Sequence, residues 1–411
     1  MIPPTTLFAA RERVLAAARP LATTETVDLA AAHGRHLAVP VHADFAWPAT
    51  DRSAMDGFAL RAADAAVAGA TLPVVGESLA GKPFAGALSP GQAIRIMTGA
   101  VVPPGADCVV PVEFTSGFAG AVVTVQKPVA AQANVRARAS ELAAGALVLP
   151  AGRLLRAAEI GVLAVLGHAT VPVVRRPRVA ILATGDEVVP VTASPLPHQV
   201  RESNSWALAA QVVECGGEAL RLGIAPDEPG PLRAALQRGL TEADVLLTIG
   251  GISKGTHDLV HGTLAELGVH PEFHGIDLKP GKPTFFGVHG GDARRYVFGL
   301  PGNPASTFTV FDLLVRPLLQ VLLGETAGAW RATAPAGDTA WQRNGRLQAL
   351  PARLEAAADG RLIAALVPPS PSGDPFGLAG GDVYVLVSGN LPHARDTAVQ
   401  LVGRSGGVRL P

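Results

Sequence analysis

The sequence has few of the residues that form disulfides or metal clusters. Only two cysteines, Cys108 and Cys215, occur among 411 residues, and neither belongs to a CxxC pair. A disulfide framework and a structural zinc site are therefore disfavoured. Net charge is also lacking, because 34 Lys+Arg residues balance 34 Asp+Glu residues. No long-range field recruits nucleic acid or an anionic membrane, so a bound anion must be held by a local cluster.

Long apolar runs and a leader sequence are missing as well. We find no run that approaches the roughly 20 apolar residues needed to cross a bilayer. Arg11, Glu12 and Arg13 interrupt the N-terminal segment before the apolar part of a signal peptide could form. Hydrophobic residues make up 48% of the chain and charged residues 17%, which excludes a disordered polyelectrolyte. We expect a cytoplasmic protein of roughly two to four domains.

Segments typical of small domains occur before residue 139 and after residue 325. Residues 5–18 show helical spacing after a threonine start, which predicts an amphipathic helix. From about 59 to 138, short β-branched runs alternate with Gly/Pro turns, a pattern typical of a small barrel or sandwich. After residue 325 such runs return, which predicts a second small β domain at the C-terminus.

The region 177–323 alternates between strand-like and helix-like segments. This alternation predicts right-handed βαβ units around a parallel sheet, and therefore an α/β domain. In such sheets the ligand lies beyond the carboxyl ends of the strands. The strands are expected at 178–184, 218–225, 244–250 and 295–302, and the helices at 203–217, 228–240, 258–268 and 304–324. Segment 190–198 is expected to be a loop.

The segment 275–283, GIDLKPGKP, places two lysines around a Pro-Gly turn. Pro280 and Pro283 restrict the backbone, so Lys279 and Lys282 are held at one edge of the domain. Two fixed ammonium groups beside a glycine-rich strand end suit a phosphate or another oxyanion. The alternative is an ordinary exposed basic turn.

Two glycine-rich loops follow predicted strands and precede predicted helices. In GGISKGTHD (250–258) the glycines allow backbone N–H groups to approach a ligand, and the helix start adds positive potential. In LPGNPAS (300–306) Asn303 can cap the helix and Pro304 suits its first position. Either loop alone could be an ordinary βα connection. Together with the lysine turn, they favour a phosphorylated ligand.

Four carboxylates stand in prominent motifs: Asp56, Glu187, Asp227 and Asp258. The last three lie at predicted strand ends of the α/β region, where a hard cation such as Mg²⁺ could join them to a phosphate. As isolated acids, each could instead be a helix cap or a solvated side chain.

Two motifs imitate known sites without their essential residues. GESLAGK (76–82) copies most of a phosphate-binding P-loop, but Pro83 replaces the hydroxyl residue that holds Mg²⁺. HDLVH (257–261) has histidines four residues apart but lacks the glutamate of HExxH. We reject both as sites. With two scattered cysteines, a thiol nucleophile is also disfavoured.

Seven motifs occur together in a fixed order. The chain resembles the molybdopterin molybdenumtransferase (MoeA) family, to which the E domain of gephyrin is also similar, and the resemblance covers essentially the whole chain. The motifs are SAMDGFAL (53–60), RIMTGAVVPPGADCVV (95–110), ATGDEVV (183–189), SNS (203–205), GGISKGTHD (250–258), KPGKP (279–283) and GLPGNPAS (299–306).

The resemblance implies a fold, an activity and an assembly. It implies molybdenum insertion into adenylylated molybdopterin with release of AMP, assisted by Mg²⁺ or a similar cation. It also implies a homodimer with the site in a cleft between protomers, and contacts with the adenylyltransferase of the pathway and with recipient molybdoenzymes. The implied domains are an N-terminal helix on the α/β domain (1–24), an elongated domain (25–45 and 139–176), an inserted β domain (46–138), the α/β molybdopterin-binding domain (177–325) and a C-terminal β-barrel (326–411).

The site residues carry over position by position. Lysines and glycine-loop amides are expected to hold oxyanions, while carboxylates position a cation and a water. The catalytic positions are Asp56, Thr98, Glu187, Asp227 and Asp258, with Glu187 and Asp258 as the metal ligands. The substrate-binding positions are Gly250, Gly251, Ser253, Lys279, Lys282, Pro301, Gly302, Asn303 and Ser372.

The chain departs from the family pattern at three places. Ala139-Ser140-Glu141 replaces Gly-Glu-Asp, and Asp374-Pro375-Phe376 follows Ser372-Gly373 where the family has Ser-Gly-x-Met-Leu. Pro351 aligns with a family arginine, for which Arg346 and Arg353 are possible substitutes. Two other functions stay open: a molybdopterin adenylyltransferase, and a cofactor-binding scaffold without turnover.

Overall fold

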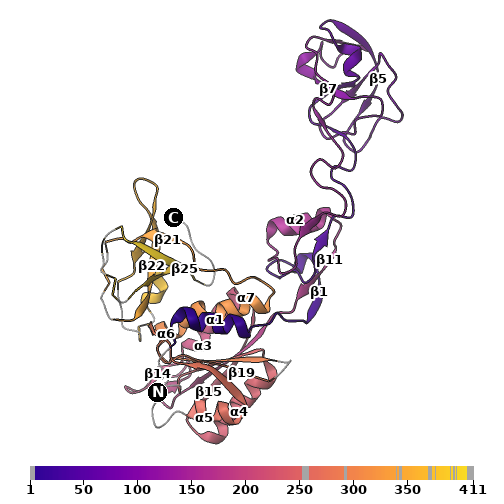
Figure 1. Ribbon diagram of the computed structural model, residues 1–411. Helices are drawn as coiled ribbons and strands as arrows, with labels where there is room; N and C mark the ends of the chain where they lie inside the picture. The colour runs from indigo at the N-terminus through magenta and orange to yellow at the C-terminus, as the bar shows by residue number, and fades with distance from the viewer. Residues whose placement is uncertain are drawn as a thin grey trace. The chain divides into compact units, whose positions relative to one another are not determined.

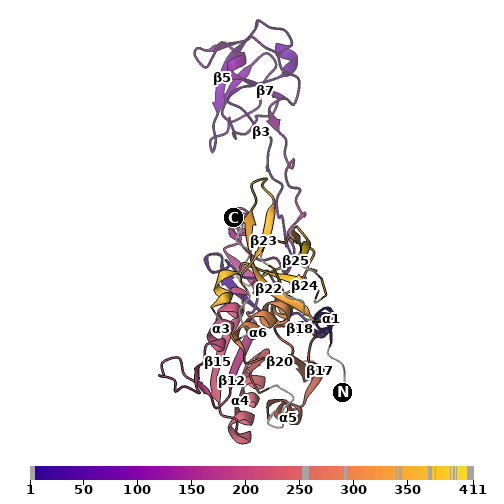
Figure 2. The ribbon, with the colours of Figure 1, turned by 90° about the vertical axis from the view of Figure 1, so that its left-hand side faces the viewer.

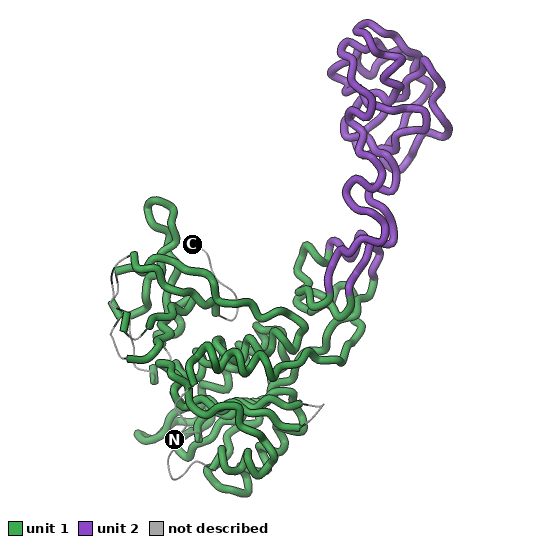
Figure 3. Tube along the Cα trace, viewed as in Figure 1, with its two compact units in different colours: residues 1–39, 151–160, 169–411 green, residues 40–150, 161–168 purple. Residues whose placement is uncertain are grey.

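The computed structural model forms two compact units (Figure 3). Unit 1 comprises residues 1–39, 151–160 and 169–411, and unit 2 comprises residues 40–150 and 161–168. The structure describes residues 5–251, 259–290, 294–338, 340–341, 345–368, 373–374, 376–388, 390–391, 394 and 396–404.

A six-stranded sheet forms the centre of unit 1. Its order is β15-β12-β16-β20-β19-β17, and the first four strands are parallel, which confirms the four predicted strands. The prediction of a purely parallel sheet was incomplete, because β19 and β17 pair antiparallel at one edge. The strands are β12 (Arg178–Thr184), β15 (Glu218–Ala225), β16 (Val245–Ile249), β17 (Val269–His274), β19 (Phe285–His289) and β20 (Arg295–Leu300).

Helices cover both faces of this sheet (Figure 1). Side chains of a strand alternate between the faces, so Val179 and Ile181 pack with α1, α3 and α7, whereas Ala180 and Leu182 pack with α4 and α5. The helices predicted from periodicity are all present. They are α1 (Leu7–Ala17), α3 (Asn204–Glu214), α4 (Pro229–Glu242), α5 (Leu259–Glu266), α6 (Pro304–Val310), the π-helical turn η4 (Phe311–Val315) and α7 (Arg316–Leu322).

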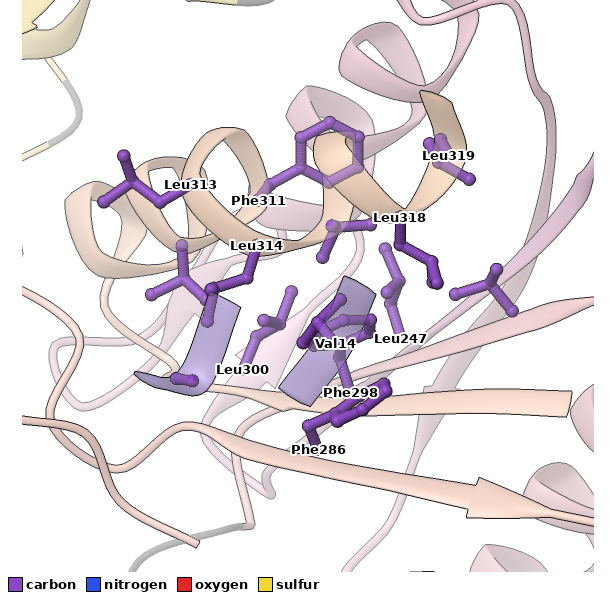
Figure 4. Close-up of a cluster of buried hydrophobic side chains, with 14 of the residues drawn as sticks. Val14, Leu247, Phe286, Phe298, Leu300, Phe311, Leu313, Leu314, Leu318 and Leu319 are labelled. Atoms are coloured by element: carbon purple, nitrogen blue, oxygen red, sulfur yellow. The ribbon is translucent and has the colours of Figure 1, made fainter. Parts of the chain in front are cut away.

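The N-terminal helix α1 is part of the core rather than an appendage. Thr6 occupies its N-cap, and the Thr6 side chain accepts a hydrogen bond from the backbone N–H of Ala9 at 3.3 Å. Leu7, Ala10 and Val14 recur at helical spacing and are buried, as the predicted amphipathic pattern requires. Figure 4 shows Val14 beside side chains of the sheet and of the 304–322 helical run.

The run Pro304–Leu322 corrects one expectation from the sequence. It is 19 residues long with a mean hydropathy of 1.3, so by length and composition it could cross a membrane. In the fold, 72% of its most apolar window is buried. Leu313, Leu314 and Leu318 are fully buried in the core of unit 1, which identifies this helix as a core helix.

Short paired strands flank the α/β core of unit 1. β1 (Thr24–Asp28) pairs antiparallel with β11 (Thr170–Val174). In the chain, η1 (Leu29–Ala31) follows β1 and α2 (Ala157–Val165) precedes β11. β13 (Val188–Val189) pairs parallel with β14 (Val200–Arg201), so segment 190–198 connects two strands as the loop that was predicted.

The C-terminal segment folds into a second sheet that shares the core with the helical layer. Its order is β18-β22-β24-β25-β21, with β23 on β22, and a bridge between Ala336 and Ala364 connects the β21 end to β23. Tyr384, Leu386 and Val402 pack with the α6–α7 layer. Figure 2 shows β22 and β24 next to α6. The elements are β18 (Leu278–Lys279), β21 (Thr333–Pro335), β22 (Leu347–Ala356), β23 (Leu362–Leu366), the 3-10 helix η5 (Gly377–Gly380), β24 (Val383–Val387) and β25 (Ala398–Gly403).

Unit 2 contains the β-rich segment that was predicted between 59 and 138. A five-stranded sheet has the order β7-β4-β6-β5-β8, and two further pairs are β3–β9 and β2–β10. Its elements are β2 (Val41–His42), β3 (Arg52–Ser53), β4 (Gly57–Leu60), η2 (Ala62–Ala65), β5 (Ala70–Ser78), β6 (Ala93–Ile96), β7 (Cys108–Pro111), η3 (Val112–Phe114), β8 (Val122–Val125), β9 (Val135–Arg136) and β10 (Leu147–Leu149).

We predict that Leu314→Ala lowers the free energy of unfolding by about 2–5 kcal/mol, because a fully buried leucine leaves a cavity when truncated. Leu196 is 56% exposed, so Leu196→Ala is the matched control and should change stability by less than about 0.5 kcal/mol. Urea denaturation of both variants measures the difference. Equal effects of the two substitutions would contradict the core assignment.

Candidate active site

Three loops meet at the carboxyl edge of the central sheet, as the strand order predicts. The Thr184 hydroxyl at the end of β12 donates to the Ile249 carbonyl at 3.1 Å, and the backbone N–H of Gly250 donates to the Leu300 carbonyl at 3.0 Å. A Cβ atom on Gly302 would lie 3.9 Å from the Gly250 Cα. The loops after β12, β16 and β20 are therefore in mutual contact.

The first glycine loop has no room for side chains. Gly250 and Gly251 have φ values of +85° and +61°, a region that favours glycine. A Cβ on Gly250 would lie 3.0 Å from the Thr184 carbonyl oxygen, and one on Gly251 would lie 2.6 Å from Val260. The backbone can thus approach a ligand closely. The predicted site residues Ser253 and Asp258 lie outside the described residues.

The second glycine loop, Pro301–Asn303, is held from two sides. The Asn204 side-chain amide donates to the Gly302 carbonyl at 2.7 Å, and the Thr307 hydroxyl donates to the Pro301 carbonyl. Asn303 occupies the N-cap position of α6, but its side chain makes no capping hydrogen bond, so the predicted cap was wrong in this detail. The asparagine of the SNS motif, Asn204, therefore holds the loop that follows β20 through a hydrogen bond.

Three carboxylates gather beside these loops: Asp186, Glu187 and Asp227. The backbone N–H of Asp227 donates to an Asp186 carboxylate oxygen at 3.3 Å. Burial raises the pKa of Asp227, and the negative charges of Asp186 and Glu187 raise it further. No Lys or Arg of the described chain forms an ion pair with any of the three.

Sequence reasoning singled out Glu187 and Asp227 but missed Asp186. Asp186 stands in the same TGDE motif, so its position just past a predicted strand was the available signal. Within the described ranges, no three His, Cys, Asp or Glu side chains are arranged to hold a metal ion. Among the described residues the cluster has no cationic partner, and the raised pKa of Asp227 is the kind of electrostatic cost that a bound cation relieves.

The lysine turn is fixed by its backbone and joins two sheets. Lys279 lies in β18, which pairs with β22 of the C-terminal sheet, and the Thr284 hydroxyl donates to the Gly281 carbonyl at 2.6 Å. A Cβ on Gly281 would lie 2.7 Å from Val310, so the turn packs against α6. Lys279 and Lys282 are exposed, and neither forms an ion pair with a described residue. Their ammonium groups are available to an anionic ligand.

Two predicted residues come together in unit 2. The backbone N–H and the hydroxyl of Thr98 both donate to one carboxylate oxygen of Asp56 at 2.7 Å. These hydrogen bonds lower the pKa of Asp56, the backbone bond having the larger effect. A Cβ on Gly57 would lie 2.0 Å from the Val110 carbonyl oxygen, so only glycine lets β4 approach β7 directly after Asp56. The AMDGF motif therefore holds an ionised carboxylate at the end of a strand.

The candidates for the missing family arginine lie in different places. Pro351 is inside β22, opposite Tyr384. Arg346 donates to the Leu278 carbonyl at 3.5 Å, directly beside the lysine turn, whereas Arg353 donates to the Gly380 carbonyl at 2.7 Å. Of the two, Arg346 is the better placed to join the lysines. Ser372 lies outside the described residues.

The structure also argues against a P-loop at 76–82 and against a thiol nucleophile. Segment 76–82 runs from β5 into a tight turn in which Leu79 and Lys82 exchange backbone hydrogen bonds, not into the helix that a P-loop requires. Burial raises the pKa of both Cys108 and Cys215 to about 12, so neither is a ready thiolate.

Known proteins are similar to this chain over most of its length. Residues 5–167 match the family model of the MoeA N-terminal region (domain I and II), and residues 180–321 match that of a probable molybdopterin-binding domain. A molybdopterin molybdenumtransferase from Nostoc is 40% identical over 309 residues, which cover 74% of this chain and 71% of that protein. The chain belongs to the molybdopterin molybdenumtransferase family.

Other family members and a solved structure agree. The molybdopterin molybdenumtransferase of Bacillus subtilis is 37% identical, over 74% of this chain and 72% of that protein. The crystal structure of the molybdopterin biosynthesis MoeA protein from Pyrococcus horikoshii has a TM-score of 0.81 at 30% identity and covers 98% of this chain and 99% of that chain. The family resemblance drawn from seven motifs is thus confirmed, as is a multidomain architecture of α/β and β parts.

The carboxylate cluster makes stability depend on pH in a defined direction. Because the folded state raises the pKa of Asp227, it holds that proton to higher pH than the unfolded chain does. We predict that the contribution of Asp227 to the free energy of unfolding, measured as wild type minus Asp227→Asn, falls as pH rises through the ordinary Asp range towards the raised value. The difference between wild type and Asp28→Asn, at an exposed strand end, should stay constant over the same range. Urea denaturation across about pH 3 to 6 tests this; parallel curves for wild type and Asp227→Asn would contradict it.

Proposed function

We propose that this chain transfers molybdenum to molybdopterin in the synthesis of molybdenum cofactor. The observation that carries the proposal is the meeting of two glycine loops beside a carboxylate cluster that has no cationic partner among the described residues, in a chain of this family. We further propose that the pterin arrives adenylylated, that molybdate is the metal source, and that AMP leaves. A phosphate-linked substrate suits the loops and lysines of the carboxyl edge.

Each group of residues has a proposed role. Backbone N–H groups of Gly250, Gly251 and the Pro301–Asn303 loop approach the phosphate oxygens, and Lys279 and Lys282 neutralise negative charge. Glu187 and Asp258, with Asp186 and Asp227 beside Glu187, hold a divalent cation. When bound, a cation such as Mg²⁺ neutralises charge between these carboxylates and the phosphate. Ser253 and Ser372 complete the substrate contacts in this proposal.

Asp56 and Thr98 of unit 2 extend the proposal to the assembly. Asp56 is exposed and held ionised by Thr98, which suits a residue that meets a ligand or cation. We propose a homodimer in which this pair completes the site in a cleft between protomers. We also propose the four-domain division with a closed C-terminal barrel over 326–411, a cytoplasmic location, and contacts with the adenylyltransferase of the pathway and with recipient molybdoenzymes.

One assay separates the candidate functions. Purified protein is incubated with adenylylated molybdopterin, molybdate and Mg²⁺, and nucleotides are followed. Release of AMP that depends on molybdate supports the transferase. Consumption of ATP by this protein alone supports an adenylyltransferase instead, and tight pterin binding without AMP release supports a scaffold without turnover.

We predict that Lys279→Ala and Lys282→Ala each weaken binding of the adenylylated pterin by about 1.5–3 kcal/mol, the range of a charge-assisted hydrogen bond. Lys82→Ala, at an exposed turn of unit 2, is the control and should leave affinity unchanged. Isothermal titration calorimetry measures the three affinities. Wild-type affinity in both lysine variants would show that Lys279 and Lys282 form an ordinary surface turn and do not bind the ligand.

We also predict that Glu187→Gln and Asp258→Asn lose most turnover yet melt within a few degrees of wild type. Both substitutions keep the shape of the side chain and remove its charge, so cation binding suffers while packing persists. Raised Mg²⁺ should restore part of the activity of at least one variant. Glu214→Gln, on the exposed end of α3, should behave as wild type. If both variants unfold, Glu187 and Asp258 are structural helix caps. If both variants are fully active, these residues are not part of the site.

A further inference from the structure

Arg221 has no role in the site described above, yet its side chain reaches the beginning of α3. It stands on β15, the edge strand of the central sheet, opposite Ile181 of β12. The pairing shifts by one residue directly after Arg221, because Gly223 rather than Leu222 lies opposite the next residue of β12. A bulge of this kind re-aims neighbouring side chains. Since α3 packs on β15, the Arg221 guanidinium meets the first turn of that helix.

A chain of hydrogen bonds joins Arg221 to the N-terminus of α3. Arg221 Nε donates to the Ser205 hydroxyl at 2.8 Å, and this hydroxyl donates to Glu202 Oε2 at 2.5 Å. The backbone N–H of Ser205 donates to Glu202 Oε1 at 2.7 Å. The Ser203 side chain at the N-cap makes no capping hydrogen bond, so Glu202 satisfies a helix-start N–H in its place. The conformation of the first turn therefore depends on Glu202 and on what holds it.

The carboxylate in this chain is buried and has one cationic partner. The Glu202 side chain is 5% exposed, and Arg221 Nη2 lies 3.7 Å from its Oε2. No other Lys, Arg or His of the described ranges forms an ion pair with Glu202. The Arg221 guanidinium also lies 3.5 Å from the centre of the Trp206 ring, a cation–π contact that restricts it. Loss of the cation would leave a buried charge uncompensated, so we expect the turn to rearrange without Arg221.

The same helical turn holds the glycine loop after β20. Asn204 is the first residue of α3, and its side-chain amide donates to the Gly302 carbonyl at 2.7 Å. The peptide between Gly302 and Asn303 is trans, so its C=O and N–H point in opposite directions. The hydrogen bond from Asn204 therefore also fixes the direction of the Asn303 N–H. That group belongs to the loop proposed above to approach phosphate oxygens.

We propose that Arg221 is a positioning residue for phosphate binding, acting through the first turn of α3 on the loop at Gly302. The inference rests on the proposed function, because that function places a phosphate at this loop. Arg221 does not touch the ligand: it holds Ser205 and Glu202, these hold the turn, and Asn204 passes the position of the turn to the loop. In this it differs from the lysines, whose charges meet the ligand directly.

The test measures binding of AMP and of inorganic pyrophosphate by calorimetry, with wild type and Arg221→Met. The substitution should weaken the binding seen in wild type roughly three- to tenfold, the range found for residues that act on a site from a distance. Arg233→Met is the matched control. It removes an ion pair of 2.7 Å with Glu266 between exposed side chains of α4 and α5, so binding should match wild type.

A double-mutant cycle distinguishes positioning from a general loss of stability. Asn204→Ala removes the last link to the loop and should weaken the same binding. In the Asn204→Ala background, Arg221→Met should weaken binding by less than about twofold further, because both residues act along one route. A loss of stability unrelated to this route would reduce binding by the same factor in both backgrounds. That result would overturn the proposal.

A second variant keeps the test decisive if Arg221→Met fails to fold. Ser205→Ala breaks the chain of hydrogen bonds but retains both charges, and it should weaken binding in the same direction. Wild-type binding in Ser205→Ala, or in a folded Arg221→Met, overturns the proposal, as does a wild type that binds neither probe. If the variants behave as expected but wild type releases no AMP with molybdate, the proposed function fails while the assignment of Arg221 stands.

Discussion

Burial of both faces of β12, β16 and β20 is the constraint on which the rest of unit 1 depends. Alternate residues of β12 enter two separate cores, one under α1, α3 and the 304–322 run and the other under α4 and α5. A strand covered on both faces has no solvent-facing side for polar chemistry. Polar groups can therefore gather only where the strands end, and the loops that follow Thr184, Ile249 and Leu300 meet there.

The same apolar layer ties the C-terminal sheet to this edge. Tyr384, Leu386 and Val402 are buried against the helical run that covers the central sheet. Strand β18, which belongs to the α/β segment, joins the C-terminal sheet by pairing with β22. Lys279 is part of this shared strand, so the position of the lysine turn depends on both sheets. A cavity of about 230 Å³ arises from the same packing, since α3, α6 and the C-terminal domain each supply a wall.

The two acidic motifs are placed in opposite electrostatic environments. Hydrogen bonds from Thr98 stabilise the ionised form of Asp56, whereas burial and two neighbouring carboxylates disfavour the ionised form of Asp227. The first arrangement favours the ionised carboxylate, and the second disfavours it.

The sequence by itself determined the elements, the family and most of the candidate site. Periodicity predicted the parallel strands and their helices, because hydrophobic spacing is a local property that burial selects directly. Strand ends marked Glu187, Gly250 and Gly302 as neighbours, since parallel strands present their carboxyl ends at one edge.

Only the tertiary structure decided which distant segments touch. The antiparallel pair β17–β19, the pairing of β18 with β22 and the approach of Asp227 to Asp186 all join segments whose contact no local pattern encodes. Gln211 reads in the sequence as one polar residue of an amphipathic helix. Its burial and its hydrogen bond to the Phe308 carbonyl of α6 become visible only in the fold, because hydrogen-bond partners depend on every neighbour in space.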